Sequence, residues 1–140
     1  SWKTIVQRAK EQELLWRGGQ YRSAIQSYYK SAAGGTPAAL PSELESLVKD
    51  SRSVEVKRHL RKLFPDPMTG GDWDLVKDPA GRILGVRSRS KLEPFKKDGF
   101  SEENKDFAGK TSYNEWEFVF DLAAAQKTIK LANKNKNLKK

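Results

Sequence analysis

One uninterrupted stretch decides the fold: residues 2–33, which read WKTIVQRAKEQELLWRGGQYRSAIQSYYKSAA. It contains no proline, and most of its polar positions hold Arg, Lys, Glu or Gln, which favour helices. A helix of this length is a rod of about 50 Å, longer than a domain of this size is wide. The sequence therefore predicts that the chain is organised around one long helix from Trp2 to about Ala33.

The apolar residues of this stretch fall on two opposite faces of the predicted helix. One face carries a core-facing stripe made of Leu14, Tyr21, Ile25, Tyr28, Tyr29 and Ala32. The other face carries Trp2, Ile5, Ala9 and Trp16. The change of face falls near Gly18-Gly19, where each glycine weakens a helix by about 1 kcal/mol. Two interpretations stay open. Either the helix simply has some exposed aromatics, or its second half packs on this domain while its first half projects towards other copies or a membrane.

Composition limits the class of protein. The length of 140 residues is typical of one domain, and 36% hydrophobic with 32% charged residues indicates a soluble one. Four Trp, four Tyr and six Phe are enough to anchor a core. Cysteine is absent, which excludes disulfides and thiolate metal sites but leaves the compartment open. No apolar run has the roughly 18 residues of a membrane span, and no signal peptide is visible.

The net charge of +9 is concentrated at the end of the chain. Six lysines and no acidic residue occupy 127–140, and removing them from the formal charge leaves +3 for residues 1–126. A basic tail of this kind is commonly a solvated end. The other interpretation is that it binds acidic polymers or phospholipid head groups.

Two short helices are predicted after the long one, which Gly34-Gly35 and Pro37 end. The first spans 41–48, with Leu44, Leu47 and Val48 as its inner face. The second follows from the helical spacing of Val56, Leu60, Leu63 and Phe64, and it ends at Pro65 and Pro67.

The apolar period then changes from 3.6 to 2, which predicts strands. Residues 73–76 and 82–87 flank the turn sequence KDPAG at 77–81 and form a predicted β-hairpin. Residues 88–114 are predicted to be a long loop pinned by Phe95, Phe100 and Phe107. Residues 115–120 alternate cleanly and predict the strongest strand, with Trp116, Phe118 and Phe120 on one face. The expected fold class is therefore α+β: a long N-terminal helix packed on a small antiparallel sheet.

Catalytic groups are sparse, and no enzyme is expected. A Ser-His-Asp or metal site would need His59, the only histidine, which lies in the basic stretch 57–62 and is interpreted as a surface or packing residue. There is no glycine-rich phosphate loop and no metal-binding histidine pair. Glu115, Glu117 and Asp121 share one face of the last strand, which is interpreted as its solvent side.

Five segments, taken in order, resemble type IV pilin-like proteins, and among these the pseudopilins of type II secretion. They are ELLWRGGQYRSAI at 13–25 with Tyr28-Tyr29, LPSELESL at 40–47, RHLRKL at 58–63 leading into DPMTG at 66–70, GRILGVRS at 81–88, and NEW at 114–116. Together they cover roughly residues 2–120. The resemblance implies a pilin-like domain at 1–121 and leaves 122–140 as a Lys-rich tail, either helical or disordered.

The resemblance also implies a location and partners. Members of this family carry an apolar N-terminal helix that anchors them in the bacterial inner membrane, with the domain in the periplasm, and that later packs at the centre of a filament. Residues 2–33 look like the soluble half of that helix, so the chain is expected to be a piece whose membrane helix was removed. Methylation, contact with the inner-membrane assembly machinery, and filament contacts with its own copies and other pilin-like subunits are implied in the same way. Some pseudopilins hold calcium in the late loop, where oxygen ligands are available here from Asp98, Glu102, Glu103 and Asp106; no cofactor is otherwise expected.

The expected function is thus that of a pseudopilin-like or pilin-like structural subunit of a cell-envelope filament that serves protein secretion or a related export. Trp2, Ile5, Ala9 and Trp16 are its predicted subunit-interaction residues. The alternative is a minor pilin that binds DNA or another polyanion through a basic surface, although nucleic acid is not the partner we expect. The residues of that surface are Lys49, Arg52, Lys57, Arg58, Arg61 and Lys62.

Overall fold

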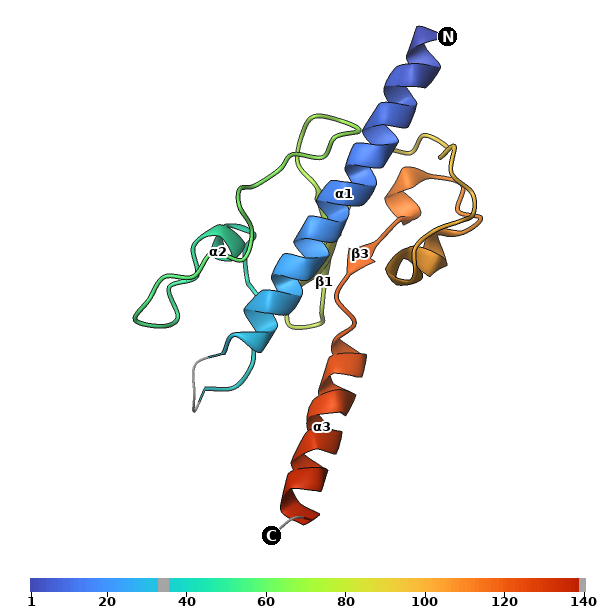
Figure 1. Cartoon of the computed structure of the whole chain (residues 1–140). Coiled ribbons are helices and arrows are strands. Elements are labelled where there is room, and N and C mark those ends of the chain that lie inside the picture. The colour runs from blue at the N-terminus through green and yellow to red at the C-terminus, as the bar shows by residue number, and fades with distance from the viewer. Residues whose placement is uncertain (33–35, 139–140) are drawn as a thin grey trace.

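The computed structural model describes residues 1–32 and 36–138 and has the predicted α+β class. A long helix α1 (Trp2–Lys30) lies across a three-stranded antiparallel sheet of order β1-β2-β3 (Figure 1). The strands are β1 (Asp74–Lys77), β2 (Ile83–Arg87) and β3 (Phe118–Val119). The other elements are α2 (Glu45–Val48), α3 (Leu122–Leu138) and two 3-10 turns, Glu102–Phe107 and Tyr113–Glu115.

The helix α1 begins at an N-cap, where the hydroxyl of Ser1 accepts a hydrogen bond from the Thr4 amide. It runs without interruption through Gly18-Gly19 and ends at Lys30, three residues earlier than predicted. The predicted stop at Gly34-Gly35 lies outside the described residues. Every predicted core-facing position within the helix is buried, and the stripe is extended by Glu11, Gly18 and Ala24.

The predicted change of face at the glycine pair is wrong for the buried residues. The buried stripe stays on one face from Glu11 to Tyr29, because these positions recur at intervals of three and four residues. Gly18 itself belongs to that stripe: a Cβ atom on it would lie 2.4 Å from the ring of Phe118 in β3. Gly18 is thus the point where α1 and the sheet come closest, and it is not a weak point in the helix.

The two neighbouring glycines are expected to respond in opposite ways to the same substitution. Gly18→Ala should lower the free energy of unfolding by about 1–2 kcal/mol, since overpacking against the buried Phe118 ring outweighs the better helix propensity of alanine. Gly19→Ala should raise it by about 0.5–1 kcal/mol, because a Cβ there meets no atom within 4 Å. Urea unfolding of both variants tests this, and a stabilised Gly18 variant would contradict the packing described.

The predicted β-hairpin is confirmed. β1 and β2 pair antiparallel, and the turn between them closes through the Asp78 carboxyl, which accepts from the Arg82 amide at 2.8 Å. Gly81 has a φ of +83°, which a side chain would disfavour. In β2, Gly85 allows the backbone of β3 to approach, since a Cβ on it would lie 2.1 Å from the carbonyl oxygen of Phe118.

The last strand is much shorter than predicted, with only Phe118 and Val119 paired to β2. The alternation is real, because Trp116, Phe118 and Phe120 are all buried. Trp116, however, lies beyond the strand at the end of the second 3-10 turn, where its ring stacks on Phe107 with 5.4 Å between centroids. The loop 88–114 is thus pinned by aromatics as predicted, with Phe107 deeply buried, while Phe95 is half exposed.

The predicted helix around residues 56–64 does not form. The backbone amides of His59 and Leu60 donate to the carbonyl of Leu47, and Asp50 and Lys57 form an isolated antiparallel bridge. These long-range bonds take the place of the i to i−4 pattern of a helix. Leu60 and Phe64 still reach the core, whereas Val54 and Val56 are exposed.

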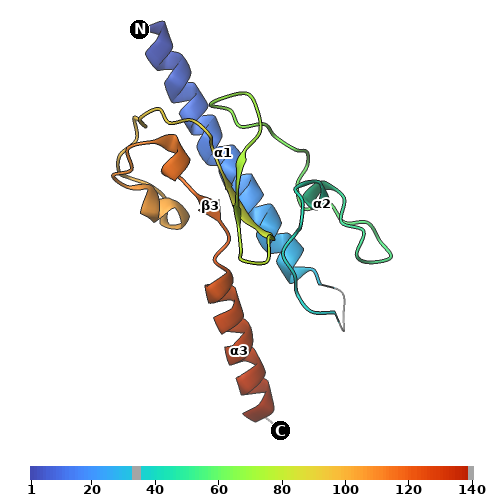
Figure 2. The ribbon, with the colours of Figure 1, turned by 180° about the vertical axis from the view of Figure 1, so that it is seen from behind.

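The neighbouring helix and the tail differ less from expectation. α2 is shorter than the predicted 41–48, but Leu47 is fully buried and Leu44 and Val48 pack against the core as predicted. The tail is helical from Leu122 to Leu138, and no residue of α3 is buried. Figures 1 and 2 show α3 leading away from the sheet, at the end of the molecule opposite the N-terminus. Lys139 and Lys140 lie outside the described residues.

Candidate interaction surfaces

The first turns of α1 extend past the sheet and carry the predicted apolar face (Figure 2). Trp2 is 77% exposed and Ile5 is 59% exposed, and Ala9 is exposed as well. Exposure of these side chains is what the predicted subunit-interaction face requires. These side chains leave apolar surface open on the side of the helix that faces away from the domain.

Trp16 continues this face but also touches its own domain. Its ring meets the Phe64 ring edge to face at 5.2 Å, which leaves the residue 50% exposed. The guanidinium of Arg17, beside it, donates to the carbonyl of Pro65 at 2.8 Å. The exposure of the apolar face of α1 therefore decreases along the helix, from Trp2 to Trp16, which partly packs on the domain.

The opposite side of the same turns is held by the loop 88–114, through a residue that the sequence analysis missed. Glu11 is buried, and its carboxyl accepts from the backbone amides of Phe95 and Lys96 and from the hydroxyl of Tyr113. Gln7 adds donors to the Glu93 carbonyl and to the same hydroxyl. Burial raises the pKa of Tyr113 to about 12. The signal was available, because Glu11 lies three residues before Leu14 on the buried stripe.

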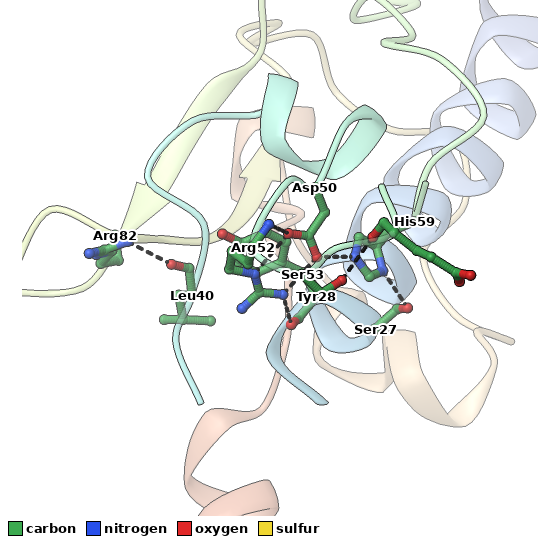
Figure 3. A network of polar contacts seen from close by, with 9 residues as sticks. Ser27, Tyr28, Leu40, Asp50, Arg52, Ser53, His59 and Arg82 are labelled. Carbon is green, nitrogen blue, oxygen red and sulfur yellow. Dashed lines mark hydrogen bonds and ion pairs between the residues drawn. The ribbon is translucent and has the colours of Figure 1, made fainter. Parts of the chain in front are cut away.

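The only histidine is not a surface residue. The side chain of His59 is 3% exposed, and its ring lies between Ser27 on α1 and Asp50 after α2, at 2.7 Å and 2.8 Å (Figure 3). Asp50 also accepts two hydrogen bonds from the guanidinium of Arg52, which covers the ring of Tyr28 at 3.5 Å. Hydrogen bonding from Arg52, followed by that from His59, holds the pKa of Asp50 well below its usual range.

A serine, a histidine and an aspartate in contact invite comparison with a hydrolase triad, but the arrangement lacks two parts. Ser27 is inside α1, where backbone amides serve the helix and leave no oxyanion hole beside the hydroxyl. Asp50 faces Nε2 and Ser27 faces Nδ1, the reverse of the serine-protease arrangement. We therefore interpret this network as a link that fastens residues 50–60 to α1, which agrees with the packing role predicted for His59.

The predicted polyanion-binding residues differ in how far their side chains are already engaged by contacts within the protein. Arg52 is occupied by Asp50 and by the carbonyl of Tyr28, and its side chain is only 28% exposed. The amine of Lys62 lies 5.3 Å from the Phe64 ring. The rest are exposed and form no ion pair within residues 1–32 and 36–138: Lys49, Lys57, Arg58 and Arg61.

The carboxylates considered for calcium do not form a cage. Within the part of the chain that the structure describes, no three acidic, histidine or cysteine side chains come together to hold a metal ion. Asp98, Glu102, Glu103 and Asp106 are all exposed, and Glu102 pairs with Lys105 at 3.2 Å. Glu115, Glu117 and Asp121 are exposed too, as predicted for a solvent side.

No family model, characterised protein or solved structure matches the chain. None of the helices within residues 1–32 and 36–138 has both the length and the hydropathy to cross a membrane.

Proposed function

We propose that the chain is a structural subunit, pseudopilin-like or pilin-like, that assembles into a cell-envelope filament for protein secretion or a related export. The observation that carries this proposal is the apolar face of Trp2, Ile5 and Ala9 on helix turns that extend beyond the sheet. Grouped exposed apolar residues commonly mark an interaction site. Parallel long helices of neighbouring subunits are the partner surface that fits a helical stripe.

The energetics favour such an assembly. Fully burying a large apolar side chain is worth about 1.5–3 kcal/mol, so Trp2, Ile5 and Trp16 together offer several kcal/mol at one contact. The opposite side of α1 is already occupied by Glu11 and the loop 88–114, which directs any helix neighbour to the open face. The proposed partners are other copies and related pilin-like subunits, and the proposed location is the bacterial envelope, anchored in the inner membrane before assembly.

Charge on the open face is expected to stop assembly without unfolding the domain. Trp2→Glu should change the free energy of unfolding by less than about 0.5 kcal/mol, as exposed substitutions do. Trp16→Glu should cost about 1 kcal/mol, because it also removes the ring contact with Phe64. In cells that produce the protein, both variants should lose the subunit cross-links that the wild type forms.

Lys3→Glu is the matched control, because it places a carboxylate on the neighbouring position about 100° around the helix. It should retain the cross-links. If the tryptophan variants cross-link like the wild type, the proposed role of this face is wrong. If Trp16→Glu unfolds the domain, Trp16 is a core residue. The cross-links of Trp2→Glu alone then test the role of this face in assembly.

The alternative function, a minor pilin that binds DNA or another polyanion, is favoured by one observation. Lys57, Arg58 and Arg61 are exposed and form no ion pair within the described residues. Measuring duplex DNA binding at two salt concentrations, with and without residues 127–140, distinguishes non-specific binding from binding through this surface. Binding that falls steeply with salt and disappears with the tail is non-specific, whereas binding that survives removal of the tail and is lost on neutralising these residues supports the alternative.

A further inference from the structure

The helix α3 is a basic helix that touches the core near its start, through Leu122 and Ala125. None of its residues from Leu122 to Leu138 is buried, and it contains no acidic residue. Lys127, Lys130 and Lys134 recur at intervals of three and four, so they share one face. Leu131 and Leu138, on the border of that face, are 53% and 75% exposed. A helix of this kind has both charge and apolar surface to offer a partner.

The same chain carries a hollow of opposite charge. It is an open surface hollow of about 1100 Å³ between α1, the β1-β2 turn, the first 3-10 turn and the start of α3. Its apolar lining includes Val76, Leu84, Val119 and Phe120. Three cations line it, namely Arg22, Lys30 and Lys105, against twice as many carboxyl groups: Asp78, Glu102, Glu103, Asp106, Glu117 and Asp121. An acidic hollow with an apolar lining is unexpected in a chain of net charge +9.

We infer that the lysine face of α3 of one copy docks in the acidic hollow of a second copy. The occupant follows from charge and shape: three lysines and two leucines on the helix match carboxyl groups and apolar side chains in the hollow. A copy cannot fill its own hollow in this way. Thr128 is the last residue of α3 that lines it, and α3 leads away from the domain (Figure 1), so Lys130 and Lys134 do not line the hollow.

This contact is heterologous, since the surface offered by one copy differs from the surface that receives it. Contacts of this type repeat and give open chains unless a rotation closes them into a ring. The contact goes beyond the proposed function and does not use Trp2, Ile5 or Trp16. If the α3 contact is disproved, the proposed role of the α1 face still stands. If the role of the α1 face is disproved, the α3 contact still stands.

Two neutralised variants of the whole chain test the inference. The helix variant replaces Lys127, Lys130 and Lys134 with Gln, and the hollow variant carries Glu103→Gln, Asp106→Asn and Glu117→Gln. All six side chains are exposed, and none has a hydrogen bond or ion pair within the described residues, so both variants should fold. The matched controls neutralise exposed residues elsewhere: Lys3, Lys91 and Lys110 in one, Glu43, Glu55 and Asp98 in the other.

Sedimentation equilibrium provides the readout. The wild type and both controls should self-associate at about 0.05 M salt and weaken at about 0.5 M. Each neutralised variant alone should have a dissociation constant raised at least about tenfold. An equimolar mixture of the two should regain association, because it restores one intact junction between α3 of the hollow variant and the hollow of the helix variant.

Three results would overturn the inference. The wild type could stay monomeric at low salt, one neutralised variant could associate as the wild type does, or the mixture could remain monomeric. If only the helix variant loses association, α3 binds a different surface of the neighbouring copy. A wild type that stays monomeric but binds anionic vesicles or DNA through α3 would assign the helix to a polyanion instead.

Discussion

Asp66→Ala is expected to lower the free energy of unfolding by about 4 kcal/mol, among the largest losses that one substitution causes. Asp66 is fully buried, and its carboxyl oxygens accept from the Ser88 hydroxyl, the Thr69 hydroxyl and the backbone amides of Met68 and Arg89. Alanine would leave these donors without a partner in the interior, at about 1–3 kcal/mol for each that stays buried. The bonds join the segment before β1 to the end of β2, so the loss affects the edge of the sheet.

Chemical denaturation of matched variants measures this effect. Asp66→Asn keeps the shape and one acceptor oxygen, so it should be less harmful than Asp66→Ala. Asp72→Ala, at an exposed aspartate in the same region, should change stability by less than about 0.5 kcal/mol. A loss below about 1 kcal/mol for Asp66→Ala would show that water reaches these donors.

Tyr28→Ala is expected to cost about 3–5 kcal/mol, the loss typical of a large aromatic core residue. The residue is 6% exposed. Its ring contacts side chains from the segment that follows α2. Its ring lies 3.5 Å from the Arg52 guanidinium and meets the ring of His59 at 5.6 Å. The substitution should therefore also loosen residues 50–60 from α1.

Tyr28→Phe separates the ring from the hydroxyl. It keeps both ring contacts, and the hydroxyl has no hydrogen bond within the described residues, so stability should change by less than about 1 kcal/mol. Hydrogen exchange of the amides of His59 and Leu60 reports on the loosening, because both donate to Leu47 across the same segment. Unchanged protection in Tyr28→Ala would mean that the ring does not hold this segment.

The sequence by itself determined the features that depend on neighbours along the chain. The absence of proline and the recurrence of Leu14, Tyr21 and Ile25 were enough to predict α1 and its buried face. The turn sequence at 77–81 was enough to predict the hairpin. The exposure of Trp2 and Ile5 followed as well, because they lie opposite that face on the same helix.

Only the tertiary structure decided the features that depend on partners far away in the chain. Val56, Leu60 and Phe64 have helical spacing, yet their segment is not helical. Backbone hydrogen bonds to Leu47 and Asp50 hold it in another conformation. From its basic neighbours, His59 was interpreted as a surface or packing residue. Its hydrogen bonds to Ser27 and Asp50 join positions too far apart in the sequence for a local pattern to predict.

Gly18 and Gly19 show the same limit at two adjacent positions. In the sequence they are equivalent, and both weaken the helix by the same amount. In the fold, one faces open space and the other touches the ring of Phe118, one hundred positions further along the chain. Local periodicity determines which face of a helix is apolar, but the depth to which that face is packed depends on the side chain that the rest of the chain brings against it.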